Sequence, residues 1–223
     1  MTERWKQYIL GGLEHAGGPV RFAVEQWMFL FPVYIAIRRA LPSGGRILDV
    51  GCGGGAFTSV LSTYGFSMVG VDQDADVVAR AREVGRALGG EAVFEQADAF
   101  DLSPYHGRFD LVYSLGVVEH FDRDVTVALI KEQARCATAV MVVIPTKFTK
   151  YAATVTDERL YTRGELIAMV RDAGLVVTDS FVYGEVPTQL SRYLRLLLPG
   201  IAYRGLQHAF SYAMGIGCVG RRP

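Results

Sequence analysis

The chain has 223 residues, half of them hydrophobic, and its 23 basic and 23 acidic side chains give a formal net charge of zero. This composition predicts one sizeable globular domain with a real core, alone or with appendages. A balanced charge provides no basic surface for nucleic acid, so a small-molecule partner is expected. Three scattered cysteines (Cys52, Cys136 and Cys218) do not form a disulfide framework or a metal motif, and they indicate reduced thiols in a cytoplasmic protein.

Residues 1–43 precede the first predicted strand and are expected to form an N-terminal helical cap or lid. Within them, Trp27–Ile37 has eleven residues without a charge and is interrupted by Pro32. A membrane-spanning helix needs about 20 apolar residues. A buried helix with its aromatic side chains in the core is therefore favoured over a membrane contact.

From Gly44 onward, short β-branched runs alternate with helical stretches, which is typical of a parallel sheet with crossover helices. Nearly continuous apolar runs predict five fully buried strands, at Arg46–Gly51, Ser67–Asp72, Ala92–Gln96, Phe109–Ser114 and Val140–Ile144. Helices are expected between them over Ala56–Tyr64, Asp76–Leu88 and Asp124–Ala137.

The chain changes character after Pro145. The pattern predicts a polar connection over Phe148–Arg159, followed by a helix over Arg163–Ala173 and a strand over Val176–Tyr183. A second helix over Gln189–Leu198 and a last strand over Met214–Arg221 are expected to follow. An insertion around residues 185–213 contains the apolar stretch Leu190–Phe210, in which arginines are interspersed. A substrate-side cap with solvated arginines is favoured for this stretch, and a peripheral membrane contact is the alternative.

A glycine-rich turn follows the first predicted strand, where Ile47–Gly55 reads Ile-Leu-Asp-Val-Gly-Cys-Gly-Gly-Gly. A strand that runs through glycines into a helix presents backbone N–H groups to a ligand, and glycine leaves room for that ligand. The positions of Gly51, Gly53 and Ala56 also satisfy the loose dinucleotide pattern. The glycines alone therefore do not exclude an NAD(P)-dependent oxidoreductase.

Two acidic residues make the prediction more specific. Asp72 ends the second predicted strand, where its carboxylate can accept hydrogen bonds from both hydroxyls of a ribose. Asp49 precedes the glycine turn, where a carboxylate would repel a pyrophosphate. Asp49 instead suits a ligand with a positive charge, such as the ammonium group of S-adenosylmethionine.

Residues 47–58, together with Asp72, Asp98 and 109–121, resemble the class I (Rossmann-like) S-adenosylmethionine-dependent methyltransferase family. The resemblance implies an α/β fold with a doubly wound, seven-stranded, mostly parallel sheet, an antiparallel last strand and helices on both faces, over residues 44–223. It implies that S-adenosylmethionine binds and leaves as S-adenosylhomocysteine. The residues expected to bind it are Asp49, Gly51, Cys52, Gly53, Gly55, Asp72, Gln73, Asp98, Ala99, Phe100, Ser114, Leu115 and Gly116.

The adjacent pair Glu119 and His120 provides the candidate catalytic residues. The unperturbed pKa of histidine lies near neutrality, so His120 could act as a general base. A histidine that lines the cofactor side of the pocket and has a structural role is the alternative. In lipid-modifying relatives a glutamate at the place of Glu119 serves the active centre, but only part of that pattern is present.

Several motifs are absent from the sequence. It has no Tyr-x-x-x-Lys pair of a short-chain dehydrogenase, no phosphate-binding loop ending in Gly-Lys-Ser/Thr, and no paired histidine or cysteine motif for zinc. The favoured function is metal-free methyl transfer to a small, hydrophobic or lipid-like acceptor enclosed by residues 1–43 and 145–213. An NAD(P)-dependent oxidoreductase and a non-catalytic cofactor-binding protein of the same fold remain the alternatives.

Overall fold

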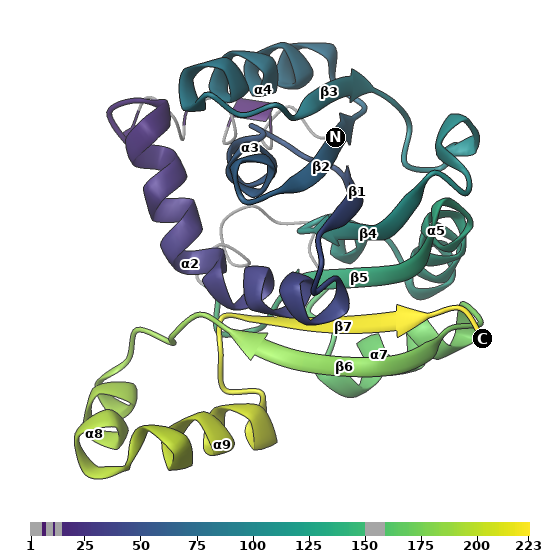
Figure 1. Cartoon of the computed structure of the whole chain (residues 1–223). Helices are drawn as coiled ribbons and strands as arrows, with labels where there is room; N and C mark the ends of the chain where they lie inside the picture. The colour runs from purple at the N-terminus through teal and green to yellow at the C-terminus, as the bar shows by residue number, and fades with distance from the viewer. Residues whose placement is uncertain (1–5, 8–10, 12–14, 150–158) are drawn as a thin grey trace.

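The computed structural model describes residues 6–7, 11, 15–149 and 159–223 (Figure 1). Its centre is a seven-stranded sheet with the order β3-β2-β1-β4-β5-β7-β6. The strands are β1 (Gly45–Val50), β2 (Phe66–Asp72), β3 (Val93–Gln96), β4 (Phe109–Leu115), β5 (Ala137–Pro145), β6 (Val176–Tyr183) and β7 (Gly215–Arg221). β7 is antiparallel to both neighbours, and the other strand pairs are parallel. The expected fold class is confirmed.

Helices cover both faces of this sheet, with α2, α3 and α4 on one face and α5 and α7 on the other (Figure 1). The described helices are α2 (Pro19–Ala40), α3 (Ala56–Thr63), α4 (Ala75–Leu88), α5 (Arg123–Cys136), α7 (Arg163–Asp172), α8 (Gln189–Leu197) and α9 (Gly200–Phe210). Short 3-10 turns form at η1 (Ser103–Tyr105) and η2 (Val118–His120). The helix α9 is missing from the sequence prediction. Most of the predicted connection Phe148–Arg159 lies outside the described residues.

Alternation along β1 distributes its side chains between two cores. Ile47 packs among the apolar residues that α2 and α3 bring to one face, whereas Leu48 joins the cluster on the opposite face. Successive side chains of a strand point to opposite faces. Asp49 has the same parity as Ile47, so its carboxyl group is directed toward the face that α3 covers.

The helix α2 is a structural layer of the domain. Leu30, Val33 and Ile37 are buried in the same core as β1 and β4, as expected for a buried helix. Of the aromatic side chains predicted to lie in the core, Phe31 is 45% exposed and lies on the outer face instead, as does Met28. By length and composition α2 is also apolar enough to cross a membrane. The boundary at residue 43 stays a prediction.

The third strand departs from its predicted burial. In β3, Phe94 is buried but Val93 is 50% exposed, and Glu95 and Gln96 are exposed as well. β3 is the outermost strand on its side of the sheet and pairs only with β2. A strand with one neighbour has an open edge, which polar side chains suit. The expectation of five fully buried strands is therefore wrong for β3.

The connection from β3 to β4 is held by one carboxylate of α5. Glu132 Oε1 accepts hydrogen bonds from the Leu102 backbone N–H at 3.0 Å and from His106 Nε2 at 2.7 Å. Arg135 Nη1 donates to Glu132 Oε2 at 2.8 Å. Burial alone would raise the pKa of Glu132, but the hydrogen bonds from His106 and Leu102 outweigh it and lower that pKa. The sequence prediction assigned no role to Glu132.

We expect Glu132→Gln to lower the free energy of unfolding at neutral pH by about 1–3 kcal/mol, because it removes the charge of an acceptor that the buried Leu102 N–H and the partly exposed His106 share. A depressed pKa contributes stability above the ordinary glutamate pKa, and this contribution disappears as the pH falls through the folded-state pKa. The difference from wild type should therefore shrink on acidification. Urea denaturation across pH measures it. Glu83→Gln, which removes an exposed partner of Arg80, is the control and should change stability by less than about 0.5 kcal/mol. Equal losses in both variants would contradict this account.

Candidate functional site

The carboxyl ends of β1, β2, β3, β4, β5 and β6 lie at one edge of the sheet, because these strands share a direction. The strand order reverses at β1: the chain passes from β1 through α3 to β2 on one side of β1, whereas β4 lies on the other side of β1. In open α/β sheets, ligands bind outside the carboxyl ends of the strands at such a change of direction. The predicted site residues follow β1, β2, β3 and β4 at this edge.

The glycine turn links β1 to α3 in a tight path. Gly51 and Cys52 both donate their backbone N–H groups to Val71 O, at 2.8 and 3.0 Å. Gly51, Gly53 and Gly55 adopt φ values of 78°, 53° and 70°, in the left-handed region that favours glycine. The turn is therefore fixed against β2.

Gly51 also permits a close approach of the segment after β4. A Cβ atom at Gly51 would lie 2.4 Å from Val117 Cγ2, which is inside any real contact distance. The absence of this atom lets the ends of β1 and β4 lie side by side. The turn thus needs glycine for both its conformation and its neighbour.

Asp49 lies buried beneath this turn, with its carboxylate in hydrogen bonds to two elements. Its Oδ2 accepts from Tyr113 OH at 2.7 Å and from Thr58 Oγ1 in the first turn of α3. Tyr113 is the residue directly opposite Asp49 in the parallel pairing of β1 with β4. Burial raises the pKa of Asp49 to about 7, although the two hydroxyl donors oppose this shift. Asp49 therefore titrates near neutrality.

Asp72 connects the glycine turn to the start of α4. Its Oδ2 accepts from Gly53 N at 3.2 Å and its Oδ1 from Asp74 N at 3.1 Å. Asp74 in turn caps α4 through its side chain. A carboxylate has about four acceptor positions, so both oxygens of Asp72 can accept further hydrogen bonds. Gln73 is exposed beside it, and its carbonyl accepts from Gln96 Nε2 at 3.0 Å.

The loop after β3 forms the next part of the edge. Asp98 Oδ1 accepts from Phe100 N at 2.9 Å, which closes a local turn. The ring of Phe100 meets that of Phe121 edge to face, with centroids 5.3 Å apart. Phe121 follows η2, so this contact joins the predicted adenine-side segment to the segment after β4. Ala99, between Asp98 and Phe100 in the chain, is partly buried.

The end of β4 carries the remaining predicted residues. Ser114 is buried with its Oγ 3.4 Å from Gln133 Oε1, and Gly116 donates its N–H to Val143 O at 3.0 Å. Leu115 and Gly116 are partly buried at the edge. The chain then turns into η2, which contains both candidate catalytic residues.

Glu119 is buried at this edge and His120 is half-buried. Glu119 Oε1 lies 3.6 Å from the position that a Cβ atom on Gly116 would occupy. Arg159 secures the turn, because its backbone N–H donates to Glu119 O at 2.7 Å and its Nη1 to His120 O at 3.1 Å. The turn therefore holds Glu119 beside Gly116, the glycine that follows β4.

Tyr183 is a site residue that the sequence analysis missed. It ends β6 at the same edge, it is buried, and its ring meets that of Phe29 on α2 with centroids 5.3 Å apart. Burial, and then the charge of Glu119, raise the pKa of Tyr183. Tyr183 thus lies near Phe29 and within the electrostatic influence of Glu119. These residues come from segments that are far apart in the chain, so local sequence patterns do not reveal that they are neighbours.

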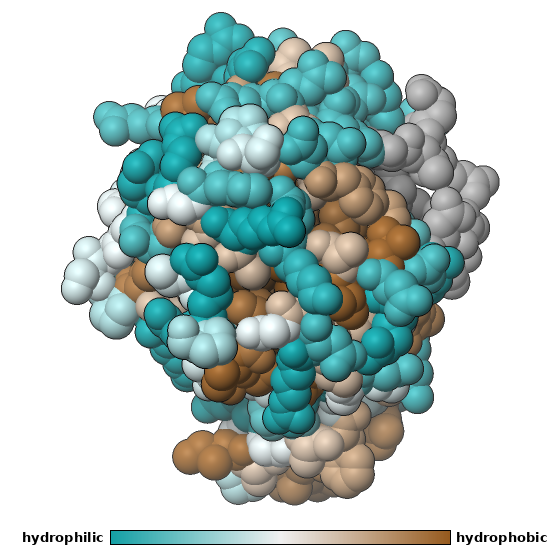
Figure 2. All heavy atoms as spheres, turned by 90° about the vertical axis from the view of Figure 1, so that its right-hand side faces the viewer, coloured by the Kyte–Doolittle hydropathy of each residue, from teal (hydrophilic) through white to brown (hydrophobic). Residues whose placement is uncertain are grey.

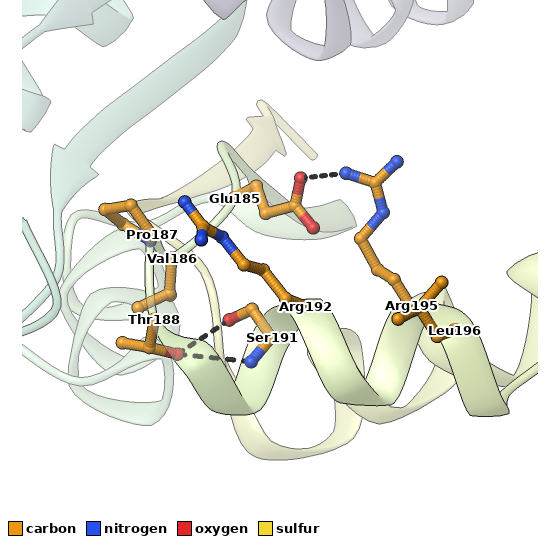
Figure 3. Close-up of a pocket in the computed structure, with 8 residues that line it drawn as sticks. All are labelled: Glu185, Val186, Pro187, Thr188, Ser191, Arg192, Arg195 and Leu196. Atoms are coloured by element: carbon orange, nitrogen blue, oxygen red, sulfur yellow. Dashed lines mark hydrogen bonds and ion pairs between the residues drawn. The ribbon is translucent and has the colours of Figure 1, made fainter.

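The remaining features lie away from the glycine turn. The ring of His106 contacts Glu132 through Nε2 at 2.7 Å, and the ring of His208 contacts Ser180 O through Nε2 at 3.0 Å. No group of three metal-ligating side chains is found among the described residues. A pocket of about 540 Å³ lies between β6 and α8 rather than at the glycine turn (Figure 3).

The comparisons with known proteins agree with this geometry. Residues 47–139 match a family described as "Methyltransferase domain". The chain is 36% identical over 107 residues to a ubiquinone biosynthesis O-methyltransferase of Azorhizobium caulinodans, covering 48% of this chain and 42% of the relative. It is 34% identical over 79 residues to the protein of that name from Methylococcus capsulatus, covering 35% of this chain and 33% of the relative. The matches therefore span less than half of these relatives.

Solved structures share the fold over most of the chain. The magnesium protoporphyrin IX methyltransferase of Synechocystis PCC 6803 with bound S-adenosylhomocysteine has a TM-score of 0.64 at 16% identity, over 92% of this chain and 86% of that one. An S-adenosylmethionine-dependent methyltransferase of Clostridium acetobutylicum has a TM-score of 0.60 at 14% identity, over 86% and 89%. Residues 47–139 therefore match a methyltransferase domain, and the chain shares the fold of these solved structures.

We expect Gly51→Ala to lower the free energy of unfolding by about 2–5 kcal/mol, since it adds left-handed backbone strain to an overpacked contact with Val117. Gly89→Ala is the matched control, because Gly89 has a similar φ of 67° and nothing within 4 Å of the added atom. It should show the strain alone, about 1–2 kcal/mol. Adding Val117→Ala should recover part of the Gly51→Ala loss in urea denaturation. No recovery, or equal losses at both glycines, would contradict the close approach.

Proposed function

We propose that this chain is an S-adenosylmethionine-dependent methyltransferase that acts on a small hydrophobic acceptor. The observation that supports the proposal best is the joint placement of the Asp49 carboxyl group, the glycine turn and the Asp72 carboxylate at one edge of the sheet. The position of the family match, across β1 to β5, supports it as well.

The residues at this edge fit the cofactor. Asp72 has acceptor capacity left for two ribose hydroxyls. Asp49 provides a carboxylate rather than a cation beside the turn, which favours an ammonium group over a pyrophosphate. The segments Asp98–Phe100 and Ser114–Gly116 flank the turn, where they would hold the adenine and the methionine portion. S-adenosylhomocysteine in the Synechocystis structure is consistent with this assignment.

The protein's contribution to methyl transfer would be positioning. When bound, S-adenosylmethionine supplies an electrophilic methyl group on a positively charged sulfur. The buried edge around Leu115, Glu119 and Tyr183 would exclude water and orient the acceptor in line with that group. Such orientation can account for several kcal/mol of a reaction barrier. Glu119 or His120 would accept the proton of an acceptor hydroxyl as general base.

The acceptor side would be built from the segments outside the family match. Tyr183 of β6 packs against Phe29 of α2 and is near enough to Glu119 to be influenced by its charge, which gives this side an aromatic surface. This lining favours a hydrophobic acceptor enclosed by residues 1–43 and 145–213. The names of the curated relatives favour oxygen as the methylated atom. The acceptor would be a hydroxylated, lipid-like molecule.

Calorimetric titration with S-adenosylhomocysteine and with NADH tests the cofactor. We expect binding of S-adenosylhomocysteine only, and a loss of at least about ten-fold in affinity for Asp72→Ala, which removes the ribose acceptor. Asp76→Ala is the matched control, because this exposed carboxylate of α4 faces Lys6 instead and should leave affinity unchanged. Binding of NADH alone, or equal affinity in the Asp72 variant, would refute the assignment. A protein that binds the cofactor but releases no S-adenosylhomocysteine with any hydroxylated acceptor would be a non-catalytic binding protein.

A further inference from the structure

A helical hairpin, α8 and α9 with their connection (residues 189–210), projects from the sheet below β6 and β7 (Figure 1). It leaves the carboxyl end of β6 and returns into β7, so both of its ends lie at the edge that holds the candidate site. Its base is tied to the end of β5, where Thr146 Oγ1 donates to Ala213 O at 2.5 Å. The hairpin is thus a fixed extension of the site edge.

The outer surface of this hairpin is apolar. Leu190, Tyr193, Leu194 and Leu197 follow the i, i+3, i+4, i+7 spacing of one helix face. Leu196 and Ile201 are each 82% exposed, and Phe210 is 76% exposed. Figure 2 shows brown and tan surface at the lower end of the molecule, where Figure 1 places the hairpin. A contiguous exposed apolar patch of this kind marks an interaction site.

The hairpin cannot simply fold this face inward, because polar contacts hold its opposite side. Ser191 is buried on the inner side of α8, and its Oγ is 3.0 Å from Tyr212 OH. Tyr203 of α9 is buried as well, with its OH 3.3 Å from Glu185 Oε1. At the end of α9, His208 Nε2 lies 3.0 Å from Ser180 O of β6. The apolar face is therefore held outward.

The charges of the hairpin have a single sign. From residue 186 to the last residue the chain has no aspartate or glutamate, while the hairpin contains Arg192, Arg195 and Arg204. Arg195 reaches back to Glu185 at 2.6 Å, and Arg192 extends along a pocket of about 540 Å³ toward Val186 and Pro187 (Figure 3). Arg192 thus lines this pocket together with the exposed Leu196, four residues further along α8. An amphipathic helix with arginines beside exposed leucines suits an anionic lipid surface.

We propose that the hairpin docks the protein on a bilayer that contains anionic lipid, with the leucines of α8 and Ile201 in the acyl boundary and Arg192 and Arg204 among the headgroups. A second copy of the chain fits this face less well. A two-fold contact would bring two hairpins together, each with three arginines and no acid, and like charges would face each other. The docking does not depend on the proposed function. If both hold, a hydrophobic acceptor would reach the site edge directly from the membrane.

Vesicle co-sedimentation of the full chain without cofactor tests the docking. Wild type is expected to sediment with vesicles of phosphatidylcholine and phosphatidylglycerol, less with phosphatidylcholine alone, and less again as salt is raised. Leu196→Gln/Leu197→Gln should lower partitioning at least about ten-fold, because two side chains lose their acyl contact. Arg192→Gln/Arg204→Gln should lower it about five-fold for each arginine, on the mixed vesicles only.

Val20→Gln/Met28→Gln on the outer face of α2 is the matched control, since both side chains are exposed and apolar but lie outside the hairpin. Its binding should equal that of wild type. Thermal unfolding of every variant shows that the fold is retained. Wild type that stays in the supernatant overturns the proposal, and so does an equal loss in the α2 variant. Self-association in analytical ultracentrifugation that Leu196→Gln/Leu197→Gln abolishes, without vesicle binding, would assign the face to a second copy instead.

Discussion

The buried carboxyl group of Asp49 is the interaction on which the site edge depends. Through Tyr113 and Thr58 it joins β1 to β4 and to the first turn of α3, directly beneath the glycine turn. An unpaired carboxylate would be costly at this depth, so the two hydroxyl donors are needed to keep it there. Burial still raises its pKa to about 7. The protein thus keeps a carboxyl group that is only half ionised near neutrality next to the place where the ligand should lie.

The other parts of the edge are arranged around this centre. Gly51 lets the segment after β4 approach the turn, and Asp72 ties the turn to α4. On the other side of β4, Tyr183 meets Phe29 of α2, and the charge of Glu119 acts on Tyr183. The family match ends at residue 139, so much of this second half lies outside it. The proposed cofactor side thus lies within the family match, and much of the proposed acceptor side lies outside it.

Much of the fold could be predicted from the sequence, because hydrophobic runs and glycine turns are local signals. The predicted bounds of Val176–Tyr183 coincide with those of β6, and the antiparallel last strand followed from the resemblance. The prediction that β3 is fully buried was wrong, because apolar content does not reveal which strand lies at the edge of a sheet. The contact between Phe29 and Tyr183 joins residues far apart in the chain, which no local pattern encodes. The roles of the predicted site residues stay predictions.

The central claim, that the Asp49 carboxylate pairs with a cationic group of the cofactor, is tested by the pH dependence of S-adenosylhomocysteine affinity. Only the ionised form of Asp49 attracts an ammonium group, so binding should release its proton. The account predicts that affinity rises as the pH increases from below 7 and levels off above it, by up to about ten-fold per pH unit on the acid side. Asp49→Asn should remove this dependence, even though Asp72 nearby also has a raised pKa. An affinity that does not change with pH in wild type, or the same slope in Asp49→Asn, would contradict the account.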